Sequence, residues 1–160
     1  MSIIDCHVHL NYYYRDTDMH NTKHFFCLED RLKVLLESMD YNDIDYSLIL
    51  SSYRVDEYRP CHLGNPWIVD CQEVLYKNKN VYADISGLFI GDFTASTEIY
   101  YITKIRELLK YVGIPHRLLY GTDWPICDME SYIKFVQKFD LDRQSFDLLM
   151  FSNSKKIFAL

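Results

Sequence analysis

Short apolar runs along the chain alternate with stretches in which apolar residues recur at helical spacing. Ile3–Leu10 predicts a short buried strand whose far end carries polar groups. From Leu28 to Met39 apolar residues recur every three or four positions, which predicts an amphipathic helix. Asp45–Ser51 is again a compact apolar run and predicts a second strand.

The second half of the chain continues this alternation with clearer boundary signals. Pro66 favours a helix start, Gly87 ends an apolar run, and Gly113 ends a periodic one. The elements predicted here are a helix over Trp67–Tyr76, a strand over Asn80–Ser86, a helix over Thr97–Val112, a strand over Leu118–Tyr120, helices over Glu130–Phe139 and Arg143–Phe151, and a last turn over Asn153–Phe158. Strands that alternate with helices predict an α/β fold with parallel strands.

Two histidines stand at the end of the first predicted strand. Successive strand residues point to opposite faces, so His7 and His9 project together on one face. Ligands bind at the carboxyl ends of parallel strands, and two converging imidazoles are suitable metal ligands. The pair alone is weak evidence for a metal site, because two histidines that only form hydrogen bonds at a strand end give the same sequence pattern.

Two other predicted strand ends or turns bring further polar groups toward the same edge. The strand in RLLYGTDWP (117–125) ends at Gly-Thr-Asp and delivers the carboxylate of Asp123. The stretch CHLGNPW (61–67) places His62 at a turn just before the helix that Pro66 starts. Convergence of these groups from separate parts of the chain is a stronger signal than any single motif.

The chain resembles the amidohydrolase superfamily, in the amidohydrolase-related branch of metal-dependent TIM-barrel hydrolases. The matching stretches are IDCHVHL at the first strand, CHLGNPW near the sixth, NVYADISGL at the seventh, RLLYGTDWP at the eighth and the tail FSNSKKIFAL. The resemblance implies that His7 and His9 are metal ligands, that Asp123 is a ligand or general base, and that His62 polarises the substrate. A divalent metal, with zinc expected, would lower the pKa of its bound water to ~7 and give a hydroxide nucleophile.

The chain is short for this family. A full (β/α)₈ barrel takes ~250 residues, and only residues 51–61 separate Leu50, near the end of the second strand, from His62. The simplest account is an internal deletion near 60/61, which leaves a single shortened domain over 1–160 with about five parallel strands of an incomplete barrel. The family's further histidine on the fifth strand has no counterpart here. His20 and His24, in the predicted loop before Leu28, are possible substitutes.

Composition limits the class of protein and its partners. The net charge is −6 and no Lys/Arg cluster is present, which argues against a nucleic-acid partner. No run reaches the ~20 apolar residues of a membrane span, and no signal peptide is recognisable at the start. The five cysteines are an odd number and form no CxxC pair, which favours a reducing cytoplasm.

Several functions therefore stay open. The first is a metal-dependent hydrolase acting on a small carbonyl, amide or ester substrate, with a decarboxylase of the same branch as a variant. The second is a non-catalytic remnant with weak or no metal binding, which the missing histidine favours. A deoxyribonuclease of another HxH barrel family is a third, disfavoured by the acidic balance. Open sheet edges would also favour a homo-oligomer that covers them.

Overall fold

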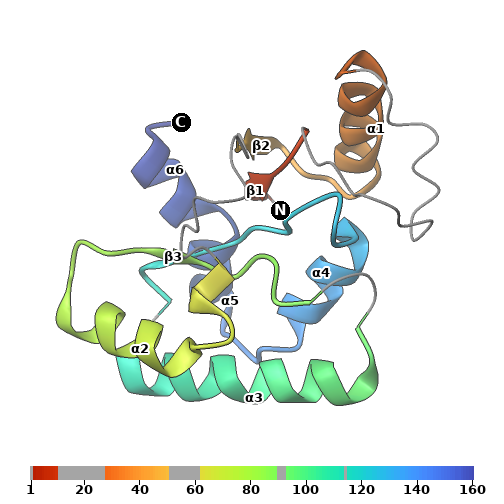
Figure 1. Cartoon of the computed structure of the whole chain (residues 1–160). Helices are drawn as coiled ribbons and strands as arrows, with labels where there is room; N and C mark the ends of the chain where they lie inside the picture. Colours follow the sequence, from red (N-terminus) through yellow and green to blue (C-terminus); the bar gives the residue numbers. More distant parts are fainter. Residues whose placement is uncertain (1, 11–27, 51–61, 90–92, 114) are drawn as a thin grey trace, which may run out of the picture.

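The computed structural model describes residues 2–10, 28–50, 62–89, 93–113 and 115–160. Its elements are β1 (Ile4–Val8), α1 (Leu28–Tyr41), β2 (Tyr46–Ile49), the 3₁₀ turn η3 (His62–Gly64), α2 (Ile68–Lys77), β3 (Ala83–Asp84), α3 (Ala95–Val112), β4 (Leu118–Leu119), α4 (Met129–Gln137), α5 (Arg143–Asp147), the π-helical η4 (Leu148–Ser152) and α6 (Asn153–Phe158). The short strands lie near the centre with the helices around them (Figure 1). A mixed α/β architecture, as the alternating pattern predicts, is confirmed.

All strand pairings among the described residues are parallel. β1 pairs with β2, and β3 pairs with β4. Backbone hydrogen bonds also join β1 to the segment that follows β4: Cys6 N–H donates to Tyr120, and His9 N–H donates to Trp124. The backbone order across the molecule is therefore β2, β1, the β4 segment and β3. The carboxyl ends of all four strands consequently meet at one edge.

The predicted strand over Asn80–Ser86 is much shorter in the structure, where only Ala83 and Asp84 form β3. Parallel pairing with β4 covers those two residues, and one further bond runs from Ile85 N–H to the Leu119 carbonyl. The chain then turns at Gly87, whose φ of 55° lies in the left-handed region. This early turn brings the residues after Asp84 toward the strand ends.

The predicted helix over Arg143–Phe151 is interrupted by a π-helical segment. α5 ends at Asp147, and η4 carries the chain into α6 with helical backbone at both junctions. The carbonyl of Leu149 accepts a hydrogen bond from Tyr120 N–H, just after β4. The π-helical segment η4 is thus hydrogen-bonded to the chain just after β4.

Burial differs between the inner strand β1 and its edge neighbour β2. Every residue of β1 is buried, as expected for a strand covered on both faces. In contrast, Tyr46 and Ile49 of β2 are about half exposed, and so are Leu32 and Leu36 of α1. The apolar stripe that predicts α1 is therefore only partly covered by the described residues.

None of the helices in the described part of the chain combines the length and the apolarity that a membrane crossing requires. The predicted loop containing His20 and His24, and the predicted deletion junction near 60/61, lie outside the described residues.

Asn153 links α6 to the start of β4. Its buried amide donates to the carbonyls of Pro115 at 2.6 Å and Leu118 at 2.8 Å. We expect Asn153→Ala to lower the free energy of unfolding by about 2–3 kcal/mol, because two hydrogen bonds to buried carbonyls are lost. Chemical denaturation measures this. The control is Asn78→Ala, whose exposed amide bonds Val74 at 2.9 Å and is replaced by water. Equal losses in both variants would contradict the prediction.

Candidate metal centre

His7 and His9 reach the carboxyl edge of the strands side by side. His7 is the fourth residue of β1, and His9 follows its last residue, so strand alternation places both on one face. Their Nε2 atoms lie 3.1 Å apart, and their rings meet edge to face with centroids 5.0 Å apart. Both side chains are largely enclosed, with exposed fractions of 2% and 12%.

Asp123 brings a carboxylate to the same point from the turn after β4. Its φ of 64° is left-handed, a strained conformation for a residue with a Cβ. Its Oδ1 lies 3.6 Å from His7 Nε2 and 3.3 Å from His9 Nε2. This oxygen is buried and accepts no hydrogen bond from the residues that the structure describes.

Hydrogen bonds on the far side of each ring orient the two histidines. Nδ1 of His7 lies 3.4 Å from Asp84 Oδ1, and Nδ1 of His9 lies 2.9 Å from the Leu50 carbonyl. Both partners accept hydrogen bonds, so in the neutral rings each Nδ1 carries the hydrogen. The two Nε2 lone pairs then face the Asp123 oxygen, an arrangement typical of metal-binding histidines and their outer partners.

The spacing of these three atoms fits a divalent cation. In a tetrahedral zinc shell with bonds of about 2.0–2.2 Å, neighbouring ligand atoms lie ~3.3–3.6 Å apart. The separations among His7 Nε2, His9 Nε2 and Asp123 Oδ1 are 3.1, 3.3 and 3.6 Å. Two imidazole nitrogens and one carboxylate oxygen also match the count and type of protein ligands in catalytic zinc sites.

Protonation of His7 competes with a metal at this point. Burial opposes a charge on the ring, but the hydrogen bond to Asp84 and the negative charges of Asp84 and Asp123 outweigh it and raise the pKa of His7. The raised pKa favours a proton on Nε2 of His7, the ring atom that faces His9 and Asp123. A metal that binds there must displace this proton, so its affinity depends on pH.

His62 approaches the site from the other side. It lies in η3, where His62 and Leu63 have left-handed φ values of 57° and 55°. Its Nε2 is 3.7 Å from Asp123 Oδ2, and its side chain is 32% exposed, more than the other site residues. Burial lowers the pKa of His62 despite the opposing charge of Asp123, so the ring is neutral at neutral pH.

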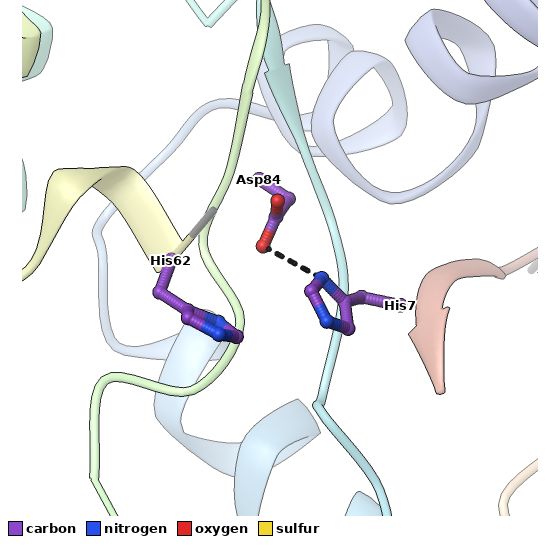
Figure 2. Close-up of side chains that lie close together, drawn as sticks. All are labelled: His7, His62 and Asp84. Carbon is purple, nitrogen blue, oxygen red and sulfur yellow. Dashed lines mark ion pairs between the residues drawn. The ribbon is translucent and has the colours of Figure 1, made fainter. Parts of the chain in front are cut away.

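Two residues at the end of β3 connect the histidines. Figure 2 shows Asp84 between His7 and His62, with an ion pair drawn to His7. Ser86 lies between Asp84 and His62: its hydroxyl donates to Asp84 and lies 2.8 Å from His62 Nδ1. Burial alone would raise the pKa of Asp84, but the hydrogen bonds from His7 and Ser86 lower it to about 2.

Asp5 fixes the turn that carries Asp123. Its fully buried carboxylate accepts hydrogen bonds from Thr122 N–H at 3.0 Å, Thr122 Oγ1 at 2.6 Å and His7 N–H at 3.1 Å. Burial raises the pKa of Asp5 to about 7, and these three hydrogen bonds oppose the shift. The Thr122 hydroxyl in turn accepts from Trp124 N–H at 3.1 Å. The residues on either side of Asp123, Thr122 and Trp124, are thus both held by hydrogen bonds.

Tyr132 of α4 fixes the loop that carries Ser86 and Gly87. Its hydroxyl donates to the Ile85 carbonyl at 2.6 Å and accepts from Leu88 N–H at 3.2 Å. A Cβ at Gly87 would lie only 2.3 Å from His62 Nδ1, so this position requires glycine. The loop therefore approaches the His62 ring as closely as a bare backbone allows.

The structure brings together all four predicted site residues. His7, His9 and Asp123 form one group of possible ligand atoms within 4.8 Å of one another, and His7, His62 and Asp84 form another. Their chemical roles stay a prediction. Sequence analysis missed Ser86, although the alternation of Asp84 and Ser86 in an apolar run repeats the pattern of the two histidines.

Comparison with known proteins relates the chain to amidohydrolases. The family described as Amidohydrolase matches residues 61–160. An amidohydrolase from Burkholderia multivorans, solved by crystallography, is similar with a TM-score of 0.50 and 20% sequence identity, over 59% of this chain and 36% of that one. The chain thus spans little more than a third of that protein, and the likeness concerns the fold alone. No curated protein matches the chain.

Proposed function

Because this chain belongs to the amidohydrolase family, we propose that it is a metal-dependent hydrolase of a small carbonyl, amide or ester substrate. One observation carries the proposal: Nε2 of His7, Nε2 of His9 and the unpartnered Oδ1 of Asp123 face one another at metal-ligand spacing. Three acceptor atoms in this arrangement repel each other unless a proton or a cation lies between them.

The residues around this point divide the chemistry among them. A divalent metal, with zinc the expected one, would supply Lewis acidity that lowers the pKa of a water toward neutrality. His7 and His9 would hold the metal, and Asp123 would hold it or the attacking water. Asp123 would also take the proton from that water. His62, the most exposed of the four side chains, faces the same space and would contact the substrate.

We also propose that the strands form part of a TIM-like barrel. The parallel order β2, β1, β4 segment, β3 is the order that four adjacent barrel strands would have, with the site at their carboxyl ends. In this proposal the chain is a single shortened domain with a deletion junction near 60/61. The half-exposed Tyr46 and Ile49 at the β2 edge support a second copy as the cover for that edge.

A non-catalytic remnant is the second candidate, and the ligand set favours it. The described residues offer three ligands at the site, and no histidine of a fifth strand is among them. A site with fewer fixed partners binds metal more weakly and positions a substrate less well. Metal content and activity together separate the two candidates.

A cytoplasmic location is proposed on the state of the thiols. Cys71 and Cys127 are free cysteines, and Cys127 is buried. Burial raises the pKa of the Cys71 thiol to about 11, so this thiol is unreactive. Free, protonated thiols are typical of a reducing compartment.

Metal removal and return tests the proposed function. Elemental analysis of the purified chain should find about one divalent ion per chain. Dialysis against a chelator should abolish hydrolysis of small esters and amides, and added zinc should restore it. Metal binding without any turnover would support the remnant, and release of CO₂ from carboxylate substrates would support the decarboxylase. A chain that binds no metal at micromolar free zinc would contradict the metal site itself.

A further inference from the structure

The side chain of Ser86 forms two hydrogen bonds, and its single hydroxyl hydrogen can serve only one of them. Its Oγ contacts Asp84 Oδ1 and lies 2.8 Å from His62 Nδ1. An ionised carboxylate only accepts hydrogen bonds, so the hydrogen of Ser86 points to Asp84. If the hydroxyl hydrogen pointed to His62 instead, Ser86 Oγ and Asp84 Oδ1 would be in close contact with no hydrogen between them, which is strongly unfavourable.

The hydrogen between Ser86 and His62 must therefore come from the imidazole. Nδ1 of His62 donates to Ser86 Oγ, and in a neutral ring the other nitrogen, Nε2, carries a lone pair. The alternative places the hydrogen on Nε2 and directs it at Asp123 Oδ2. That separation is 3.7 Å, too long for a hydrogen bond, although the charge of Asp123 does favour a hydrogen there.

We propose that Ser86 and Asp84 are positioning residues that hold His62 with its hydrogen on Nδ1, so that Nε2 faces the site as a hydrogen-bond and proton acceptor. This differs from the role implied by the family resemblance, in which His62 polarises a substrate and needs a hydrogen on Nε2 to do so. His62 then accepts a proton from the nucleophile or from the substrate. The catalytic part rests on the proposed function, whereas the position of the hydrogen is a property of the metal-free chain.

One carboxylate serves both histidines in this arrangement. Asp84 Oδ1 lies 3.4 Å from His7 Nδ1 (Figure 2) and also accepts a hydrogen bond from the Ser86 hydroxyl. Asp84 thus orients His7 directly and His62 through Ser86. Loss of Asp84 should disturb both rings, while loss of the Ser86 hydroxyl should disturb His62 alone.

The test is NMR of the metal-free chain with ¹⁵N-labelled histidine at about pH 8, where neutral rings predominate. His62→Asn identifies the His62 signals. Long-range ¹H–¹⁵N correlations should show the His62 hydrogen on Nδ1 in the unsubstituted chain. In Ser86→Ala the ratio of the two tautomers should move toward Nε2–H by about 10-fold, the effect of one hydrogen bond of about 1.4 kcal/mol.

Ser154→Ala is the matched control. Ser154 is fully buried like Ser86, but its Oγ has no hydrogen-bond partner among the described residues. This variant should leave the His62 signals unchanged. Metal affinity adds a second readout, because Asp84→Asn should lower it by about 10–100-fold and Ser86→Ala should not.

Two results would overturn the proposal. One is a His62 hydrogen on Nε2 in the unsubstituted chain, which needs no variant to fold. The other is a folded Ser86→Ala chain with the same tautomer ratio as before. A hydrogen on Nδ1 in a chain that lacks hydrolase activity would leave the proposal intact and contradict the proposed function instead.

Discussion

A chain carrying both His7→Ala and His9→Ala is expected to bind no metal at free zinc concentrations that saturate the unsubstituted chain. Two of the three facing ligand atoms are removed, and only Asp123 Oδ1 is left. Loss of an outer partner of a metal ligand already costs about 10–100-fold in affinity, so loss of two ligands should cost far more. Elemental analysis after dialysis, and calorimetric titration with zinc, measure the loss.

Stability gives an independent measurement of the same effect. A ligand that binds only the folded chain stabilises it by ~2.7 kcal/mol when its free concentration is ~100 times Kd. Zinc should therefore raise the melting temperature of the unsubstituted chain and leave that of the double variant unchanged. The control is His116→Ala, which removes an exposed histidine that precedes β4, at the other end of that strand from Asp123. It should retain the full zinc response.

Two other outcomes would contradict a metal site at His7, His9 and Asp123. If the double variant kept its zinc and His116→Ala lost it, the three facing atoms would not be the binding site. If zinc stabilised every variant equally, the response would come from nonspecific binding to surface carboxylates.

Sequence analysis predicts the helices better than the strands, for a physical reason. Helix limits depend on local signals, such as Pro66 just before α2 and Gly113 at the end of α3, which act within one turn of chain. Strand limits depend on the partner. The predicted strand over Asn80–Ser86 is shortened because β4 pairs with only two of its residues. Apolar patterning indicates that a strand exists but not how far its neighbour extends.

In the candidate site, too, some features are predictable from the sequence and others depend on distant parts of the chain. The residues with strong chemical signals, His7, His9, His62 and Asp123, are all predicted, because their strand or turn positions bring them to one edge. The hydroxyl of Ser86 is not predicted, since its importance depends on His62, which is distant in sequence and lies 2.8 Å away in the structure. The left-handed φ of Asp123 has no sequence signal either.

Gly87→Ala is expected to displace His62 and to lower hydrolase activity by at least about 10²-fold, the effect that a ~1 Å misplacement of a catalytic group can have. The added methyl would lie 2.3 Å from His62 Nδ1, 2.6 Å from His62 Cε1 and 2.8 Å from Asp123 Oδ2. Tyr132 and β3 hold the loop in place, so the His62 ring, which is 32% exposed, is the group that moves. Its hydrogen bond to Ser86 would break.

Gly113→Ala is the control for Gly87→Ala. Both substitutions place alanine at a positive φ, but only Gly87→Ala adds a steric clash. Gly113 also has a positive φ, 98°, but apart from its chain neighbours no atom of the described residues lies within 4 Å of a Cβ there. Alanine is unfavourable at either position by about 1–2 kcal/mol, because a positive φ brings Cβ close to the backbone. Denaturation should therefore show this loss in both variants and a larger total loss in Gly87→Ala, and only Gly87→Ala should shift the His62 NMR signals and lose activity. Equal activity in the two variants would mean that His62 does not act from the position seen here.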